Sequence, residues 1–350
     1  MSRTFLRRLS LGLIAASTLT APLAVAPLAV AQTAPAYSVT GHIKAPDGGY
    51  DYASFDPAHR RVYVSRAGGV LAVDVDGGAV NGHLADAQRS HEVLPLEDGA
   101  KLLVTDSGSN SAHLVDAATG NRLAEIPTGQ KPDAALFDPS SGLALVMNGK
   151  SGDVTLIDPA AQKAVGSIAI GGALEFGVAD GAGKVFVNIE DQNKIAVLDV
   201  KARAVTARYA LAGCDGPTGL AYAPDAGLLI AACANKVAKV IRASDGQDLA
   251  TLAIGAGPDA VIYDAARKLA FIPCGRDGVL VVLAVRGPSN VAVIQTVKTQ
   301  MGARTGALDP RTGALYMPTA RFSAGAGGGK PVAVPGSFEL LVVSPATGGS

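Results

Sequence analysis

A repeat of about 42 residues is the feature that most restricts what this chain can fold into. Seven polar residues each stand just before an apolar strand, and these marker residues are Asp51, His91, Asp133, Glu175, Thr218, Asp259 and Arg304. Successive markers lie 40, 42, 42, 43, 41 and 45 residues apart. Short strands repeating at roughly 40–50 residues are typical of a β-propeller. We therefore predict an all-β fold, a seven-bladed β-propeller with four-stranded antiparallel blades.

The copy at residues 130–171 shows the unit most clearly. Asp-Pro pairs and Gly-containing turns divide it into four apolar segments of strand length. The four expected strands cover residues 134–137, 143–147, 154–157 and 165–170. A single four-stranded sheet cannot bury both of its faces, so each copy needs neighbours of the same kind.

The two ends of the repeat array predict how the ring closes. The seventh unit has its third strand at 338–343 and almost no chain left for a fourth. Residues 37–43 alternate between apolar and polar side chains, as an outer strand does. We expect this segment to complete the last blade, which gives a single domain over residues 37–345. Residues 320–336 are rich in Gly and Pro, and we expect a flexible loop without an ordered strand.

The first 31 residues have the composition of a secretory signal peptide. Arg3, Arg7 and Arg8 precede an apolar run over 9–30, which ends in Ala-x-Ala cleavage sites. A retained membrane anchor is the alternative interpretation, and no later segment is long and apolar enough to span a bilayer. Cleavage after Ala31 removes three arginines and no acid, which changes the formal charge from 0 to −3. This balance argues against nucleic acid as a partner.

The repeat resembles a known family. Residues 132–139 follow the pattern PDA-x-x-FDP, and residues 146–158 follow V-x-N-x-x-x-G-x-V-x-x-ID. These patterns are similar to the YVTN-type repeat, and the chain from 37 to 345 resembles YncE-like exported β-propellers. The resemblance implies a periplasmic protein, often one without an established activity. Fold alone does not specify function, because propellers host many activities.

The markers should form a ring around one mouth of the central channel, because each begins an innermost strand. The ends of the second strands return to the same face. We expect a ligand-binding rim made of Asp51, His91, Asp133, Glu175, Asp259, Arg276, Arg304 and Arg321. The alternative is that these polar groups only bond backbone amides and water at a solvated mouth.

Two functions from different classes follow from this rim. The first is a monomeric binding or scaffold module that holds a small ligand or a protein of the periplasm or outer membrane. The second is a metal-dependent lactone hydrolase or lyase with His91 as general base. Its cation would be Ca²⁺ or Mg²⁺, with Zn²⁺ less favoured, and its candidate ligands are Asp133, Asn148, Glu175, Asn188 and Asp259.

Two further chemistries find no support in the sequence. The segment Ser90-His91-Glu92 resembles hydrolase machinery only in composition, and no G-x-S-x-G elbow exists, so no serine nucleophile is predicted. Stacking of single-stranded bases needs exposed aromatic rings. We expect the aromatic residues to lie inside the strand cores, namely Phe55, Phe137, Tyr222 and Tyr263.

Three cysteines in an exported chain leave one unpaired. If Ala223 pairs with Leu228 across a turn, Thr218 lies opposite Cys233, and Cys214 is a short loop away. We therefore predict a Cys214–Cys233 disulfide in an oxidising compartment. Cys274 stands 41 residues after Cys233, at the equivalent place in the next blade, which is too far for a bond. A metal–thiolate site that uses all three cysteines is the alternative.

Overall fold

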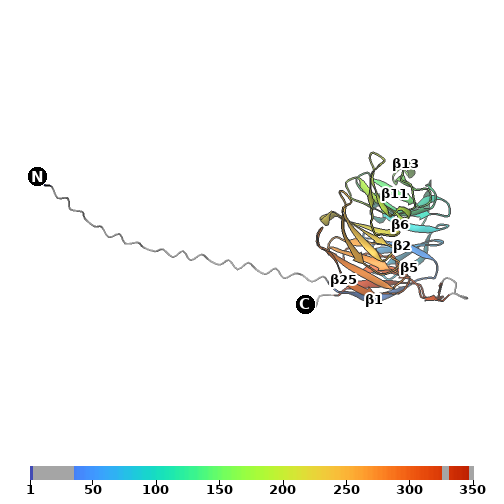
Figure 1. The fold of residues 1–350 in the computed structure, drawn as a ribbon. Coiled ribbons are helices and arrows are strands. Elements are labelled where there is room, and N and C mark those ends of the chain that lie inside the picture. Colours follow the sequence, from blue (N-terminus) through green and yellow to red (C-terminus); the bar gives the residue numbers. More distant parts are fainter. Residues whose placement is uncertain (3–34, 325–330, 347–350) are drawn as a thin grey trace. The chain divides into compact units, whose positions relative to one another are not determined.

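The computed structural model describes residues 1–2, 35–324 and 331–346. In residues 35–324 and 331–346 the chain forms seven four-stranded antiparallel sheets, which confirms the predicted seven-bladed β-propeller (Figure 1). Blades 1 to 3 use β2 (Tyr50–Asp56), β3 (Arg61–Arg66), β4 (Gly69–Asp74), β5 (Val80–Asp86), β6 (Ser90–Leu96), β7 (Lys101–Asp106), β8 (Ser111–Asp116), β9 (Arg122–Pro127), β10 (Pro132–Asp138), β11 (Leu143–Asn148), β12 (Asp153–Asp158) and β13 (Lys163–Ala169).

The remaining blades follow in the same order along the chain. Blades 4 to 6 use β14 (Leu174–Ala179), β15 (Lys184–Ile189), β16 (Lys194–Asp199), β17 (Ala204–Ala210), β18 (Pro217–Ala223), β19 (Leu228–Cys233), β20 (Val237–Arg242), β21 (Asp248–Ala253), β22 (Ile262–Asp264), β23 (Leu269–Cys274), β24 (Val279–Val285) and β25 (Val291–Lys298). Blade 7 uses β26 (Ala307–Leu308), β27 (Leu315–Thr319), β30 (Glu339–Pro345) and β1 (Tyr37–Lys44).

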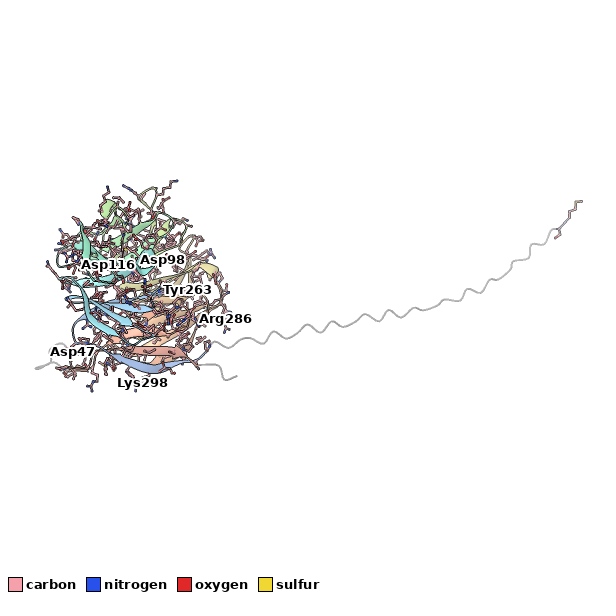
Figure 2. All side chains as sticks on the ribbon, turned by 180° about the vertical axis from the view of Figure 1, so that it is seen from behind. Asp47, Asp98, Asp116, Tyr263, Arg286 and Lys298 are labelled. Atoms are coloured by element: carbon pink, nitrogen blue, oxygen red, sulfur yellow. A yellow bond between two sulfur atoms is a disulfide. The ribbon has the colours of Figure 1, made fainter. Side chains whose placement is uncertain are left out.

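Blade faces are buried against their neighbours, as the repeat requires. The described residues contain seven apolar clusters, and each cluster joins two adjacent blades, the first and last blades included; the cluster between blades 3 and 4 also contains Tyr52 of blade 1. The middle strand β19 is buried at all six positions, whereas the outer strand β17 alternates between exposed and half-buried residues. Side chains fill the space between the sheets (Figure 2). The ring is therefore stabilised by packing between blades rather than within one sheet.

The N-terminal strand completes the last blade, as the sequence analysis expected. Strand β1 pairs antiparallel with β30 from Tyr37–Pro345 to Lys44–Glu339. Tyr37 is 2% exposed, and its ring lies 4.9 Å from that of Phe271 in blade 6. The closing strand therefore also contacts the neighbouring blade.

The Gly- and Pro-rich insertion differs from the expectation. Its two described ends form a short antiparallel pair, β28 (Phe322–Ser323) with β29 (Val332–Ala333). Backbone pairing needs no particular side chain, so composition alone did not predict it. The predicted signal peptide, residues 1–31, lies outside the described residues apart from Met1 and Ser2. In the described parts of the chain, no helix is long and apolar enough to cross a membrane.

A bulge in the innermost strands sets the position of the markers. In blades 1 to 5 the register between the first and second strands shifts at the marker and the residue after it. In blade 1, for example, Tyr50 pairs with Arg66 but Ala53 pairs with Val64, so Asp51 and Tyr52 have no regular partner. A bulge adds one residue to a strand and redirects its side chain. These five markers are thus the second residue of the strand, not the residue before it.

Candidate functional site

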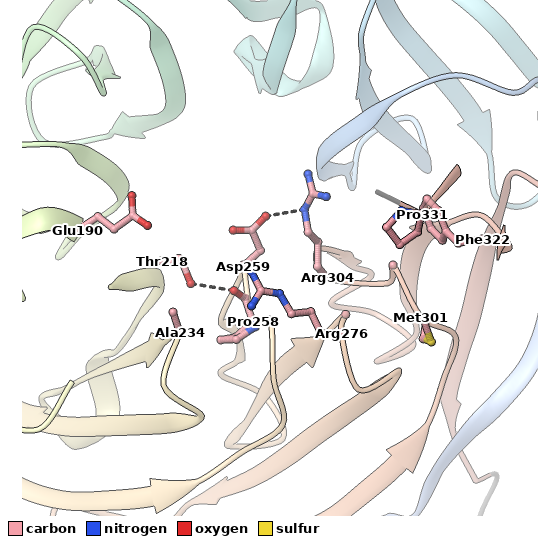
Figure 3. A pocket seen from close by; sticks show the side chains of 13 residues that line it. Glu190, Thr218, Ala234, Pro258, Asp259, Arg276, Met301, Arg304, Phe322 and Pro331 are labelled. Atoms are coloured by element: carbon pink, nitrogen blue, oxygen red, sulfur yellow. Dashed lines mark hydrogen bonds and ion pairs between the residues drawn. The ribbon is translucent and has the colours of Figure 1, made fainter. Parts of the chain in front are cut away.

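The markers meet at one mouth of the channel, where ion pairs join residues of different blades. Arg304 donates from Nε to Asp259 Oδ2 at 2.6 Å, the contact drawn in Figure 3. Its terminal nitrogen donates to Asp51 Oδ1 at 3.0 Å. Arg304 therefore bridges blades 7, 6 and 1 at the mouth.

His91 continues this network on the other side of Asp51. Its Nδ1 lies 2.7 Å from Asp51 Oδ2 and 3.6 Å from Asp133 Oδ1, and its Nε2 lies 2.9 Å from Ser107 Oγ. His91 is 8% exposed and Ser107 is half-buried. Lys131 Nζ binds the other oxygen of Asp133 at 2.9 Å. An unbroken chain of polar contacts thus runs from Asp259 to Lys131.

Two carboxyl groups at the mouth have strongly raised pKa values. Burial, together with the charges of Asp133, Asp259 and Glu190, raises the pKa of Glu175 to about 9. Burial raises the pKa of Asp259 to about 6, although Arg304 opposes this shift. Glu175 is therefore protonated at neutral pH and can donate a hydrogen bond.

The ends of the second strands have a structural role that the sequence analysis did not foresee. Ser65 Oγ donates to the carbonyl of His91 at 2.6 Å, and Thr105 Oγ1 donates to that of Asp133 at 2.7 Å. Asn188 Nδ2 donates to the carbonyl of Thr218 at 3.0 Å. Each of these side chains thus holds the marker of the next blade in position.

The three predicted carboxylate ligands, Asp133, Glu175 and Asp259, do not form a cluster with ligand atoms within 4.8 Å of each other among the described residues. The amide nitrogen of Asn188 donates to backbone carbonyls, and that of Asn148 donates to Thr155 and Asp153 within its own blade. The Oδ1 atoms of both residues, through which an Asn would bind a metal ion, are buried and have no hydrogen-bond partner among the described residues. Among the His, Cys, Asp and Glu residues that the structure describes, one group of three has ligand atoms within 4.8 Å of each other, namely Asp51, His91 and Asp133.

The charges at the mouth do not favour the metal-dependent hydrolase or lyase. Arg304 is paired with Asp259 and Asp51, and Lys131 with Asp133. Protein cations therefore occupy the places at these carboxylates that a metal ion would need. Glu175, another of the predicted metal ligands, is neutral at pH 7 because its pKa is raised. The geometry does not support this alternative.

Beside the ring lies a cavity of about 640 Å³ (Figure 3). Arg276, Arg304 and Asp259 line it together with Met301 and Phe322. Met301 is 55% exposed and Phe322 is 37% exposed. Arg276 is exposed, and no ion pair to it occurs among the described residues. Arg321 is exposed as well, and its backbone bonds Ser337 and Val334. Its side chain makes no hydrogen bond or ion pair to another residue in the described part of the chain.

Two aromatic rings from blades 1 and 4 meet immediately behind the ring of markers. Tyr52 and Phe176, the residues that follow the markers Asp51 and Glu175, have ring centroids 5.3 Å apart. Tyr52 is 4% exposed, and burial raises its pKa well above the ordinary value. Glu92, the residue after His91, is also buried, which raises the pKa of its carboxyl group well above the ordinary value. The residues behind the markers therefore make an uncharged floor for the mouth.

A second cavity, of about 630 Å³, lies where the innermost strands end, and Phe137, Phe176, Tyr222 and Tyr263 line it (Tyr263 is labelled in Figure 2). The expectation of aromatic rings inside strand cores is wrong for Phe137, which is 39% exposed. Phe55, Tyr222 and Tyr263 are half-buried. The innermost strands line the channel. Aromatic side chains near the ends of these strands therefore face the second cavity rather than the core between blades.

The cysteines are arranged as predicted. Cys214 and Cys233 form a disulfide, and Cys274 is free and buried. The pairing that led to this prediction is also found, because Ala223 lies opposite Leu228. The bulge in β18, however, places Pro217 rather than Thr218 opposite Cys233.

Sequence reasoning missed Ser107 and Lys131. Ser107 is the first residue after the second strand of blade 2, where that strand returns to the mouth, and this position was the available signal. Lys131 stands two residues before the marker Asp133 and has a positive φ of 55°. Nothing in the sequence pattern indicated that its side chain turns back to this carboxylate.

Comparisons with known proteins show the fold and no more. No known family matches the sequence, and no curated protein matches it either. A chain in the crystal structure of the mitotic checkpoint complex is similar, with a TM-score of 0.72, 15% identity, and coverage of 95% of this chain and 98% of that chain. A chain of Kuenenia stuttgartiensis hydrazine synthase has a TM-score of 0.68, 16% identity, and coverage of 84% and 97%. Because 1807 chains match, the likeness identifies a common fold.

Proposed function

We propose that this chain is an exported, monomeric binding module that holds a peptide segment of a protein partner, or a small ligand of the same chemistry, at the polar mouth of its channel. The observation that carries the proposal is the 640 Å³ cavity, in which Arg276, which has no ion pair with any residue that the structure describes, lies beside exposed apolar side chains. Concave sites with mostly apolar walls and a few polar groups are typical of ligand binding.

The lining of the cavity selects the chemistry of the ligand. Arg276 offers a guanidinium that can bind a carboxylate through two hydrogen bonds. Met301 and Phe322 offer apolar surface next to it. Arg304 is already neutralised by two carboxylates and contributes less. The ligand should therefore carry a carboxylate close to an apolar side chain, as the C-terminus of a peptide does.

Export is supported by the disulfide and by the composition of the first 31 residues. The Cys214–Cys233 bond suits an oxidising compartment, and the apolar N-terminal run has the features of a signal peptide. The resemblance to YncE-like, YVTN-repeat propellers points to the periplasm. Cell fractionation, together with mass spectrometry of the N-terminal peptide of the purified protein, tests whether the chain is exported. A mature chain that begins at Gln32 supports it, and an intact Met1 in the cytoplasm contradicts it.

A peptide library with free C-terminal carboxylates tests the binding site. We expect Arg276→Glu to weaken binding of selected peptides at least about tenfold, because it replaces the attracting charge. Arg286→Glu is the matched control, because Arg286 is also exposed in blade 6 but does not line the cavity. Equal binding by both variants would contradict the proposed site, and so would a library from which no peptide is selected. Light scattering of the purified protein tests whether it is a monomer.

A further inference from the structure

Three side chains at the mouth have the arrangement of a nucleophile, a base and an orienting carboxylate. Ser107 Oγ lies 2.9 Å from His91 Nε2, and His91 Nδ1 lies 2.7 Å from Asp51 Oδ2. These distances are within the range expected for a hydrogen-bonded triad. We propose that Ser107, His91 and Asp51 form a catalytic triad that hydrolyses small carboxylic esters. This activity goes beyond the proposed binding function and does not depend on it.

The three residues come from different elements, and the fold places them. Asp51 and His91 occupy equivalent bulges in β2 and β6, 40 residues apart, so the ring brings them side by side. Ser107 follows β7, and its backbone N–H donates to the carbonyl of Arg89 at 3.0 Å. This bond fixes the turn that presents Ser107 to His91. Ser107 is half-buried, so a small substrate can reach its hydroxyl group.

The hydrogen-bond partners select the productive tautomer of His91. Burial opposes ionisation of Asp51, but the hydrogen bond from His91 and the charge of Arg304 lower its pKa below the ordinary value. An ionised carboxylate only accepts hydrogen bonds, so the proton of neutral His91 lies on Nδ1. Nε2 then has a lone pair that faces Ser107 Oγ. Asp51 is thus a positioning residue, and Asp133 adds a second carboxylate 3.6 Å from Nδ1, which stabilises the imidazolium formed during the reaction.

The reaction needs only an ester and water. Ser107 Oγ attacks the carbonyl carbon while its proton moves to His91 Nε2. The bond between this carbon and the alkoxy oxygen then breaks, and the leaving alcohol takes the proton from His91. A water molecule attacks the resulting acyl-serine and gives a proton to His91. The ester bond to Ser107 breaks, the carboxylic acid leaves, and Ser107 regains its proton.

A small cavity beside the triad indicates the size and charge of the substrate. It has a volume of about 200 Å³, and Asp51, His91, Arg89 and Arg304 line it. Ser107 does not line this cavity and adjoins it through His91, whose Nε2 lies 2.9 Å from Ser107 Oγ. This volume suits a short acyl group. Arg89 is exposed and takes part in no ion pair among the described residues, so its guanidinium can approach the negative charge that develops on the carbonyl oxygen.

A fluorophosphonate probe and p-nitrophenyl acetate test the proposal on the purified full-length protein. We expect the probe to add its mass once, at Ser107, as located by peptide mass spectrometry. Ser107→Ala and His91→Gln should each lower the rate of ester hydrolysis by more than about 100-fold and abolish labelling. Asp51→Asn should lower the rate as well, with a change in kcat rather than in KM.

Ser109→Ala is the matched control, because Ser109 lies two residues away and bonds Ser111 Oγ at 2.7 Å without contacting His91. It should retain the wild-type rate and the wild-type labelling. The proposal is overturned if the folded wild type gains no probe mass, if the adduct forms elsewhere, or if Ser107→Ala hydrolyses the ester at the wild-type rate. Ser107→Ala should still bind the peptides selected by the wild type, because the binding site at Arg276 does not depend on the triad. Measuring this binding shows whether the triad or the binding site has failed.

Discussion

Tyr52 and Phe176 meet across the central channel, with ring centroids 5.3 Å apart, although they belong to blades 1 and 4. Each directly follows a marker residue of the ring at the mouth, so the contact lies one layer behind that ring. Phe176 also lines the cavity at the other end of the innermost strands. The two rings therefore separate the polar mouth from the aromatic opening.

Tyr52→Ala is expected to lower the free energy of unfolding by about 3–5 kcal/mol, because it removes a buried ring that contacts the far side of the channel. Tyr52→Phe keeps the ring and should cost less than about 1 kcal/mol. Urea unfolding of both variants measures the difference. If the two variants are equally stable, the contact across the channel contributes nothing.

Arg304 should stabilise the mouth more at neutral pH than in acid. Arg304→Met leaves Asp51 and Asp259 without their shared cation. Because the Arg304 side chain is 40% exposed, we expect a loss of about 1–3 kcal/mol at pH 7. The loss should shrink at pH 5, where Asp259 gains a proton because burial raises its pKa to about 6. Urea unfolding at both pH values measures this change.

Arg242→Met is the control for this prediction. The Arg242 side chain is 42% exposed and has one surface ion pair, with Asp245. It should change the free energy of unfolding by no more than about 0.5 kcal/mol at either pH. A loss at Arg304 that does not depend on pH would show that packing, not charge, is responsible.

Glu175 should make the protein less stable as the pH rises. Burial raises its pKa from 4.5 to about 9, so the folded protein holds a proton that the unfolded chain releases within this range. The contribution of the neutral group is complete below pH 4.5 and is lost between pH 4.5 and 9, by at most about 1.4 kcal/mol per pH unit. Glu175→Gln should flatten this dependence in urea unfolding. Glu125→Gln, at a half-exposed surface position, should leave it unchanged. A wild-type stability that rises over this range would refute the prediction.

The blade count and the ring closure could be predicted because they rest on a periodic pattern. Each marker introduces an apolar segment, and a sheet with two apolar faces must pack on its neighbours. The alternation in residues 37–43 predicted the closing strand for the same reason. The disulfide followed from the spacing of Cys214 and Cys233 around one hairpin.

The chemistry of the mouth could be predicted only in part. The ring of markers was predicted, but their partners were not. Asn188 was predicted as a metal ligand, and its contact with the backbone of the next blade, through Nδ2, was not foreseen because it depends on the close approach of two sheets. The contact between Ser107 and His91 depends on the bulge in β6, which has no signal in the sequence. Pairing within a sheet is local and periodic, whereas contacts between blades depend on the twist and register of each sheet.

The Cys214–Cys233 disulfide should stabilise blade 5 by restricting the unfolded chain. The cysteines are 19 residues apart, and closing a loop of this length corresponds to about 3 kcal/mol. Cys214→Ser combined with Cys233→Ser should lower the free energy of unfolding by about this amount, and Cys274→Ser is the control that leaves the disulfide intact. Thiol labelling in denaturant should detect one thiol before reduction, that of Cys274, and three afterwards. Detection of three thiols without a reductant would exclude the bond and would also remove the structural support for export.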